Sequence, residues 1–174
     1  MENFIVFRPD IHRSIVVDLS EEYFDWMACE LKKNYDIDVY PIIGTALRDY
    51  VENDVDEFTS SILKDGVFYL VQVENRIVGM GALRKLKEGI GEIKRMYIKP
   101  EYQGRGLGKK MLQLLLSRGK EYGFSAIYLE TGSFMATAQH LYRSAGFYNR
   151  EEYPETEVPP QLRHVWLFME NDFS

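Results

Sequence analysis

The stretch from Pro100 to Lys109 combines three glycines with basic side chains, a composition suited to binding an anionic group. Its sequence is PEYQGRGLGK, and it joins an expected strand to an expected helix. Glycine lets the backbone approach a ligand closely, and the free amides of a first helical turn attract a pyrophosphate. Arg105, Lys109 and Lys110 add positive charge. An ordinary glycine-rich turn is the alternative, since a three-glycine pattern alone has low specificity.

Two familiar phosphate-binding loops do not fit this stretch. A P-loop requires Ser or Thr directly after Gly-Lys, whereas Gly108-Lys109 is followed by Lys110. A dinucleotide-binding fold places its glycines after the first strand of a parallel sheet, and here they follow the fourth expected strand. A nucleotide-phosphate binder is therefore disfavoured, and the surrounding elements must decide the class of protein.

Hydrophobic periodicity predicts the elements around this loop. Three strands within residues 67–98, separated by tight turns, form an antiparallel meander. The last strand of the meander, the helix after Gly108 and the strand at 126–129 then form a strand-helix-strand unit. The expected fold class is therefore α+β with a mixed, mostly antiparallel sheet of about six or seven strands and about four helices. In order, the expected elements are a strand at 4–8, a helix from Ser20 (as N-cap) to Leu31, a helix after Gly44 to Lys64, strands at 67–73, 77–83 and 90–98, a helix after Gly108, a strand at 126–129, a helix ending at Gly146, and final strands at 147–148 and 164–169.

Composition limits the classes of function. The chain has 174 residues, of which 45% are hydrophobic and 28% charged, so we expect a single domain over residues 1–174. Its net charge of −6 argues against a sequence-independent nucleic-acid binder. One cysteine excludes an intramolecular disulfide, and three scattered histidines give no metal-ligand spacing. No signal peptide or membrane span is expected, so the predicted protein is cytoplasmic, and a monomer or homodimer.

Two motifs together resemble the GNAT superfamily of acyl-CoA-dependent N-acetyltransferases. The pattern Q/R-x-x-G-x-G/A occurs as residues 103–108, and the pattern L-Y-x-x-x-G-F occurs as residues 141–147. The resemblance covers about residues 67 to 169. It implies a three-layer fold whose sheet is splayed between the fourth and fifth strands, with acetyl-CoA as cosubstrate in the V-shaped opening.

The resemblance also implies which residues hold coenzyme A. The pyrophosphate would lie on the amides from Arg105 to Lys109, and the pantetheine would pair with the backbone of residues 96–98. The amide of Ile98 would stabilise the carbonyl oxygen as charge develops. Where many members have asparagine after the fifth strand, this chain offers Thr131 or Ser133. The expected cofactor-binding residues are Met96, Tyr97, Ile98, Gln103, Gly104, Arg105, Gly106, Leu107, Gly108, Lys109, Thr131 and Ser133.

Two side chains match catalytic positions of the family. Tyr142 would protonate the departing thiolate; alternatively it is a core residue, because Leu141 and Ala145 share its helix face. Glu92, eleven residues before Gln103, is similar to the general base of histone-type members and would act directly or through water. Its alternative is a solvated strand-end carboxylate paired with a lysine.

The acceptor is implied to be a primary amine of a small molecule, peptide or protein, which attacks the thioester directly in a ternary complex. Acidic residues cluster between positions 52 and 57 and between positions 151 and 157, and they would attract a cationic acceptor such as a polyamine. Alternatively, these residues only form charged surfaces exposed to solvent. Cys29 is expected to be a small buried hydrophobe without chemistry. A degenerate module that binds acyl-CoA without turnover is the alternative function. Four aromatic residues would line a pocket or belong to the core: Tyr23, Phe24, Tyr148 and Tyr153.

Overall fold

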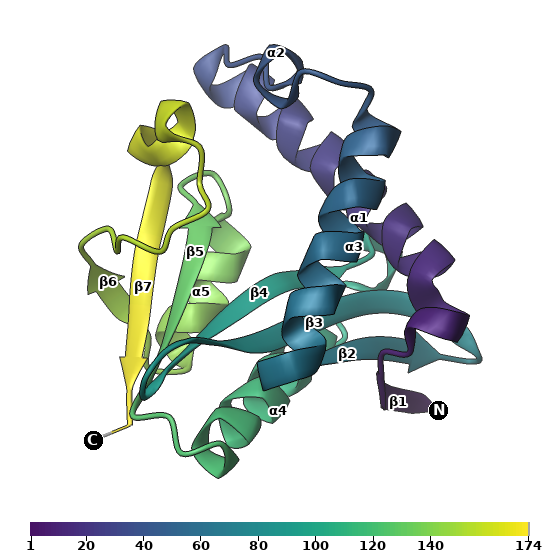
Figure 1. Cartoon of the computed structure of the whole chain (residues 1–174), viewed down its shortest axis with the longest axis vertical. Coiled ribbons are helices and arrows are strands. Elements are labelled where there is room, and N and C mark those ends of the chain that lie inside the picture. Colours follow the sequence, from purple (N-terminus) through teal and green to yellow (C-terminus); the bar gives the residue numbers. More distant parts are fainter. Residues whose placement is uncertain (174) are drawn as a thin grey trace.

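A computed structural model describes residues 1–173 as a seven-stranded sheet with helices on both faces (Figure 1). The predicted fold class, α+β with a mixed sheet, is confirmed. The elements are β1 (Glu2–Val6), α1 (Pro9–Tyr35), α2 (Tyr40–Ile43), α3 (Leu47–Asp65), β2 (Gly66–Val73), β3 (Arg76–Lys87), β4 (Ile90–Ile98), α4 (Leu107–Glu121), β5 (Ala126–Gly132), α5 (Ala136–Ser144), β6 (Tyr148–Arg150) and β7 (Trp166–Asp172), with short 3-10 helices η1 (Pro100–Tyr102) and η2 (Pro160–Val165).

The order of the strands is β1-β2-β3-β4-β5-β7-β6, and of these neighbours only β4 and β5 are parallel. The predicted meander is β2-β3-β4. Glu74 and Asn75 join its first two strands with φ of 49° and 65°, the left-handed pair that a tight hairpin turn requires.

β4 and β5 pair over only part of their lengths. Their register runs from Ile90 opposite Ala126 to Ile93 opposite Leu129. Beyond these positions β4 continues to Ile98 and β5 to Gly132 with no pairing between them. The two strands diverge in Figure 1, so the predicted opening between the fourth and fifth strands is confirmed.

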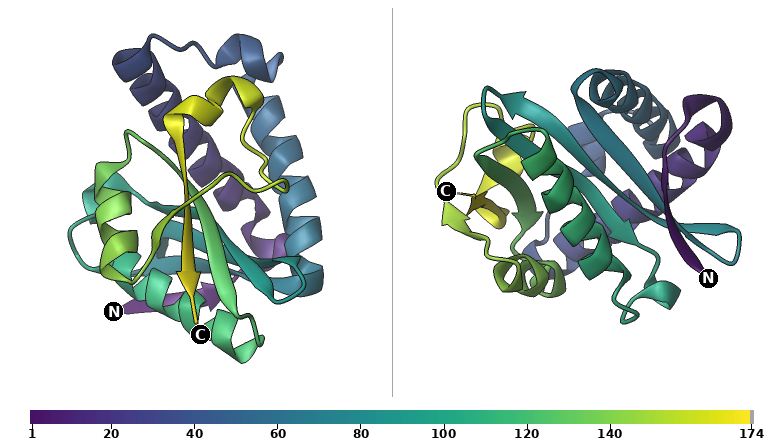
Figure 2. Two further views of the ribbon diagram at one scale, coloured as in Figure 1. Left: turned by 90° about the vertical axis from the view of Figure 1, so that its left-hand side faces the viewer. Right: turned by 90° about the horizontal axis from the view of Figure 1, so that it is seen from below.

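Two apolar cores cover the two faces of the sheet. Helices α1 and α3 pack on one face, and α4 packs on the other (Figure 2). On α4, Met111, Leu112 and Leu115 are buried, and on α3, Val51 and Val55 are buried, each set at the spacing of one helix face. β4 contributes to both cores, with Ile93 in one and Tyr97 in the other.

The first helix departs from the sequence prediction. It begins at Pro9 instead of Ser20, because proline's fixed φ suits the first helical turn. Ser20 is therefore not an N-cap but a fully buried residue within α1, and its hydroxyl has no hydrogen-bond partner within residues 1–173. Cys29 is exposed, so its predicted burial was wrong. The first strand runs over Glu2–Val6 instead of 4–8.

None of the helices within the described residues combines the length and apolar character needed to cross a membrane.

Candidate active site

The glycine loop has the backbone geometry and the free space that an anion would need. Gly104 and Gly106 have φ of 74° and 78°, the left-handed region that favours glycine. A Cβ on either would meet no described atom within 4 Å beyond its chain neighbours. The first backbone bond of α4 runs from Lys110 N to Gly106 O at 3.1 Å. The amides of residues 107–109 therefore have no partner inside the helix.

Side chains fasten this loop to the end of β4. Gln103 donates from Nε2 to the carbonyl of Ile98 at 2.8 Å. Arg105 turns back, donating to the carbonyl of Glu101 at 3.0 Å and lying 4.8 Å from the ring centre of Tyr102. The loop is held in place by its own residues, and the Arg105 guanidinium lies on η1.

A β-bulge reshapes β4 where it leaves β5. Arg95 has φ of 57°, and one extra β4 residue stands opposite β3 at this point. Lys99 donates its amide to Val78 of β3 at 2.9 Å. Because successive amides of a strand point to opposite sides, the amide of Ile98 points away from β3, towards the opening.

A cavity of about 1000 Å³ occupies the opening between the strands. Its walls come from β4, β5, the glycine loop and helices α1, α3, α4 and α5. Of the expected cofactor-binding residues, Arg105 and Ser133 are not in its lining. Ser133 is instead bonded to the hydroxyl of Tyr35 at 2.6 Å and to the carbonyl of Val165 at 2.9 Å. The expected residues that do line it are Met96, Tyr97, Ile98, Gln103, Gly104, Gly106, Leu107, Gly108, Lys109 and Thr131.

Tyr142 on α5 lines this cavity and is also part of the core beneath α4. Its ring centre lies 5.9 Å from that of Phe147. Burial raises the pKa of the Tyr142 hydroxyl, and the nearby Tyr23 raises it further. The hydroxyl is therefore protonated at neutral pH, the form in which it could donate a proton.

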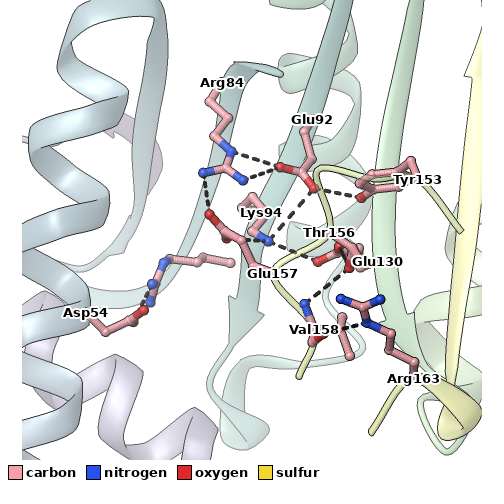
Figure 3. Close-up of polar contacts among 11 residues, drawn as sticks. Asp54, Arg84, Glu92, Lys94, Glu130, Tyr153, Thr156, Glu157, Val158 and Arg163 are labelled. Atoms are coloured by element: carbon pink, nitrogen blue, oxygen red, sulfur yellow. Dashed lines mark hydrogen bonds and ion pairs between the residues drawn. The ribbon is translucent and has the colours of Figure 1, made fainter. Parts of the chain in front are cut away.

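Glu92 is fully buried and is not part of the cavity lining. Its Oε1 accepts a hydrogen bond from Tyr153 at 2.7 Å, and its Oε2 accepts one from Arg84 Nε at 2.8 Å (Figure 3). Burial raises the pKa of the Glu92 carboxyl, although Lys94 and Arg84 act in the opposite direction. Its predicted role as base is thus restricted to a route through other groups.

Lys94 links Glu92 to the cavity wall. Its Nζ lies 3.9 Å from Glu92, 3.0 Å from Glu130 on β5 and 2.9 Å from Glu157 in the segment after β6. Arg84 also pairs with Glu157 at 2.9 Å. We call these five side chains the vertex cluster, since they lie where β4 and β5 part (Figure 3). Three of them, Lys94, Glu130 and Glu157, line the cavity.

The vertex cluster stabilises the charged forms of Lys94 and Glu157. Burial would lower the pKa of Lys94, but the three carboxylates raise it. Partial burial would raise the pKa of Glu157, but Lys94 and Arg84 lower it to about 2. The sequence prediction missed Lys94 and Glu130. The sequence did contain a signal for Lys94: side chains alternate along a strand, so residues 92 and 94 of β4 lie on the same face and can interact.

The two acidic stretches expected to attract a cation are largely ion-paired within the protein. Six of these eight carboxylates have a basic partner, so most of this negative charge is balanced within the protein. The pairs are Glu52 with Arg48, Asp54 with Arg95, Asp56 with Arg13, Glu152 with Arg163, Glu155 with Lys87, and Glu157 with Arg84 and Lys94.

Comparison with known proteins agrees with this geometry. The profile described as "Acetyltransferase (GNAT) family" matches residues 21–147. The chain is 30% identical over 172 residues to the IAA acetyltransferase of Azospirillum brasilense, covering 98% of each chain. The protein belongs to the acetyltransferase (GNAT) family, and the predicted class of enzyme, an acyltransferase, is confirmed at the level of that family.

Solved structures share the whole fold at low sequence identity. A GNAT-family acetyltransferase from Staphylococcus aureus Mu50 superposes with a TM-score of 0.72, 20% identity and 100% of both chains covered. The PaiA N-acetyltransferase of Thermoplasma acidophilum, solved in complex with coenzyme A, superposes with a TM-score of 0.71, 16% identity and 99% of both chains covered. These likenesses establish the architecture.

Proposed function

We propose that residues 1–174 form one N-acetyltransferase domain that transfers the acetyl group of acetyl-CoA to a primary amine. The amine nitrogen attacks the thioester carbonyl carbon in a ternary complex, so a C–N bond forms and the C–S bond breaks. One observation carries the proposal: β4 and β5 stop pairing after Ile93 and Leu129, and a cavity opens there beside the glycine loop. The protein's expected site of action is the cytoplasm.

The residues around the loop fit acetyl-CoA. The unpaired amides of residues 107–109, at the positive end of α4, suit the pyrophosphate. Left-handed Gly104 and Gly106 leave open space on the ligand side. The free edge of β4 over residues 96–98 suits the amide groups of the pantetheine, which bind a strand edge as another strand would. The coenzyme A of the Thermoplasma structure is consistent with such a cosubstrate.

Tyr142 and Ile98 have complementary roles in this proposal. The amide of Ile98 points to the opening and donates to the carbonyl oxygen as negative charge develops there. The protonated hydroxyl of Tyr142 gives its proton to the departing thiolate. Thiol leaves, and the new amide remains on the acceptor.

The acceptor must lose a proton before or during the attack, because an alkylamine has a pKa near 10.4. Glu92 is our proposed base. Its burial and its two partners, Tyr153 and Arg84, restrict it to action through water and the vertex cluster. Lys94 and Glu130 connect Glu92 to the cavity. The Lys94 ammonium has no lone pair to accept a proton, so water beside Glu130 carries the proton towards Glu92.

The test of the proposed function is release of thiol from acetyl-CoA in the presence and absence of primary amines, alongside the rise in melting temperature with acetyl-CoA alone. An acetyltransferase gives amine-dependent thiol and a mass increase of one acetyl group on the amine. A module that only binds acyl-CoA gives the rise in melting temperature without thiol. Absence of both results rejects the proposal.

A further inference from the structure

A row of aromatic rings crosses the opening from β4 through α1 to β7. Tyr97 of β4 lies 5.3 Å from Tyr23 of α1, which stacks at 5.9 Å on Trp26. Trp26 lies 6.1 Å from Phe134, which follows β5, and Phe134 lies 5.8 Å from Trp166 of β7. All five line the cavity. We call these five residues the aromatic row. The row connects β4 and α1 on one side of the opening to the segment after β5 and to β7 on the other side.

Trp26 is the most accessible member of this row, with 40% of its surface exposed. A half-exposed indole inside a cavity offers a flat apolar face to a ligand, and aromatic groups prefer to stack against such faces. Phe134 and Trp166, on the opposite wall, are only partly buried. Because the Trp26 and Phe134 rings already lie 6.1 Å apart, a planar group has room on the exposed face of Trp26 and not between the two rings.

The charges of the same cavity argue against a polycation. Its lining includes three carboxylates, on Asp54, Glu130 and Glu157, and three basic side chains, so its formal charge is zero. Each carboxylate is already paired with a cation of the protein, and Glu130 also accepts from Thr156. Several ammonium groups would each need a partner that this cavity does not supply.

From these observations we propose that the acceptor is a monoamine whose amino group is carried by an aromatic body, which stacks on the exposed face of Trp26. This inference rests on the proposed acetyl transfer and names its acceptor class. The amino group then points into the part of the same cavity that Ile98 and Tyr142 line, where the proposed thioester lies.

The experiment compares three amines with acetyl-CoA: 2-phenylethylamine, butylamine and spermidine, each at the same range of concentrations. We expect kcat/KM for 2-phenylethylamine to exceed that of either other amine by about 10-fold or more, from the burial of one ring. Trp26→Ala should remove most of this preference, and Trp26→Phe should keep it. Tyr122→Ala, which truncates an exposed aromatic residue outside the cavity, should leave the preference unchanged.

The experiment distinguishes a wrong proposal for the acceptor from a wrong proposal for acetyl transfer. If spermidine or butylamine is the better substrate, or if Trp26→Ala slows all three amines equally, the acceptor class is wrong and acetyl transfer stands. If no amine yields thiol and acetyl-CoA does not raise the melting temperature, acetyl transfer itself is rejected, and the acceptor class with it. A preference for the aromatic amine that depends on Trp26 supports both.

Discussion

Lys94 on β4 donates a hydrogen bond of 3.0 Å to Glu130 on β5, one residue beyond the last paired positions of the two strands. The contact replaces backbone pairing with an ion pair at the point where the sheet opens. Lys94 also holds Glu157, so the segment after β6 is fastened to the same place. The vertex cluster therefore does two things: it closes the narrow end of the cavity, and it connects buried Glu92 to it.

Replacing Tyr142 with phenylalanine tests the proposed acid. The ring and its packing against Phe147 are kept, while the proton donor is lost. We expect kcat to fall by about 10- to 1,000-fold with little change in melting temperature. Tyr69→Phe is a matched control, since it removes a buried tyrosine hydroxyl that accepts from Arg118 instead. Activity of Tyr142→Phe equal to that of the control would leave Tyr142 with a packing role only.

Replacing Glu92 with glutamine should affect both stability and the pH profile. Arg84 and Lys94 would lose a buried counter-charge, and we expect the free energy of unfolding to fall by about 3 kcal/mol. Activity should drop most near neutral pH and recover partly in alkali, where the amine is already neutral.

The pH profile of kcat/KM separates the two roles of Glu92. Glu88→Gln is the control, because Glu88 also pairs with a lysine, Lys85, but lies exposed at the β3–β4 turn. An equal loss of activity at every pH would assign Glu92 a structural role. No loss at any pH would transfer the role of base to water or to another carboxylate.

The lowered pKa of Glu157 makes the free energy of unfolding depend on pH. Its pKa is about 2 in the folded protein against an ordinary value of 4.5, because Lys94 and Arg84 stabilise the charged form. The stabilisation is complete above pH 4.5 and is lost as the pH falls towards 2. Urea unfolding at several pH values should show a shallower decline below pH 4.5 in Glu157→Gln than in the wild type. Parallel curves would mean that Glu157 forms no such pair in solution.

The glycine loop and the β2-β3-β4 meander could be predicted because their signals are local. Gln103 to Gly108 form a contiguous motif, and alternation of apolar residues identified β2, β3 and β4. The start of α1 was misjudged because Ser20 is followed by two glutamates, a sequence typical of an N-cap, while Pro9 and Asp10 form an equally good start further back.

The surroundings of Glu92 and the aromatic row could not be predicted from the sequence. Glu92 is buried because Arg84, one strand away, and Tyr153, 61 residues later in the chain, fold over it. Members of the aromatic row come from positions as far apart as Tyr23 and Trp166. Contacts between such distant residues follow from the register of β4 and β5 and from the path of the segment after β6, which no local pattern encodes.

Binding of acetyl-CoA at the N-terminus of α4 is most directly tested by calorimetric titration of three proteins: the wild type, Gly106→Glu and Gly123→Glu. Both glycines have positive φ, 78° and 75°, and open space around the missing Cβ, so the two substitutions impose similar backbone strain. Only Gly106 precedes the amides proposed to hold the pyrophosphate. We predict wild-type affinity for Gly123→Glu and affinity reduced by about 100-fold or more for Gly106→Glu, where a carboxylate meets the phosphates. Equal affinity of the two variants would contradict the proposed site.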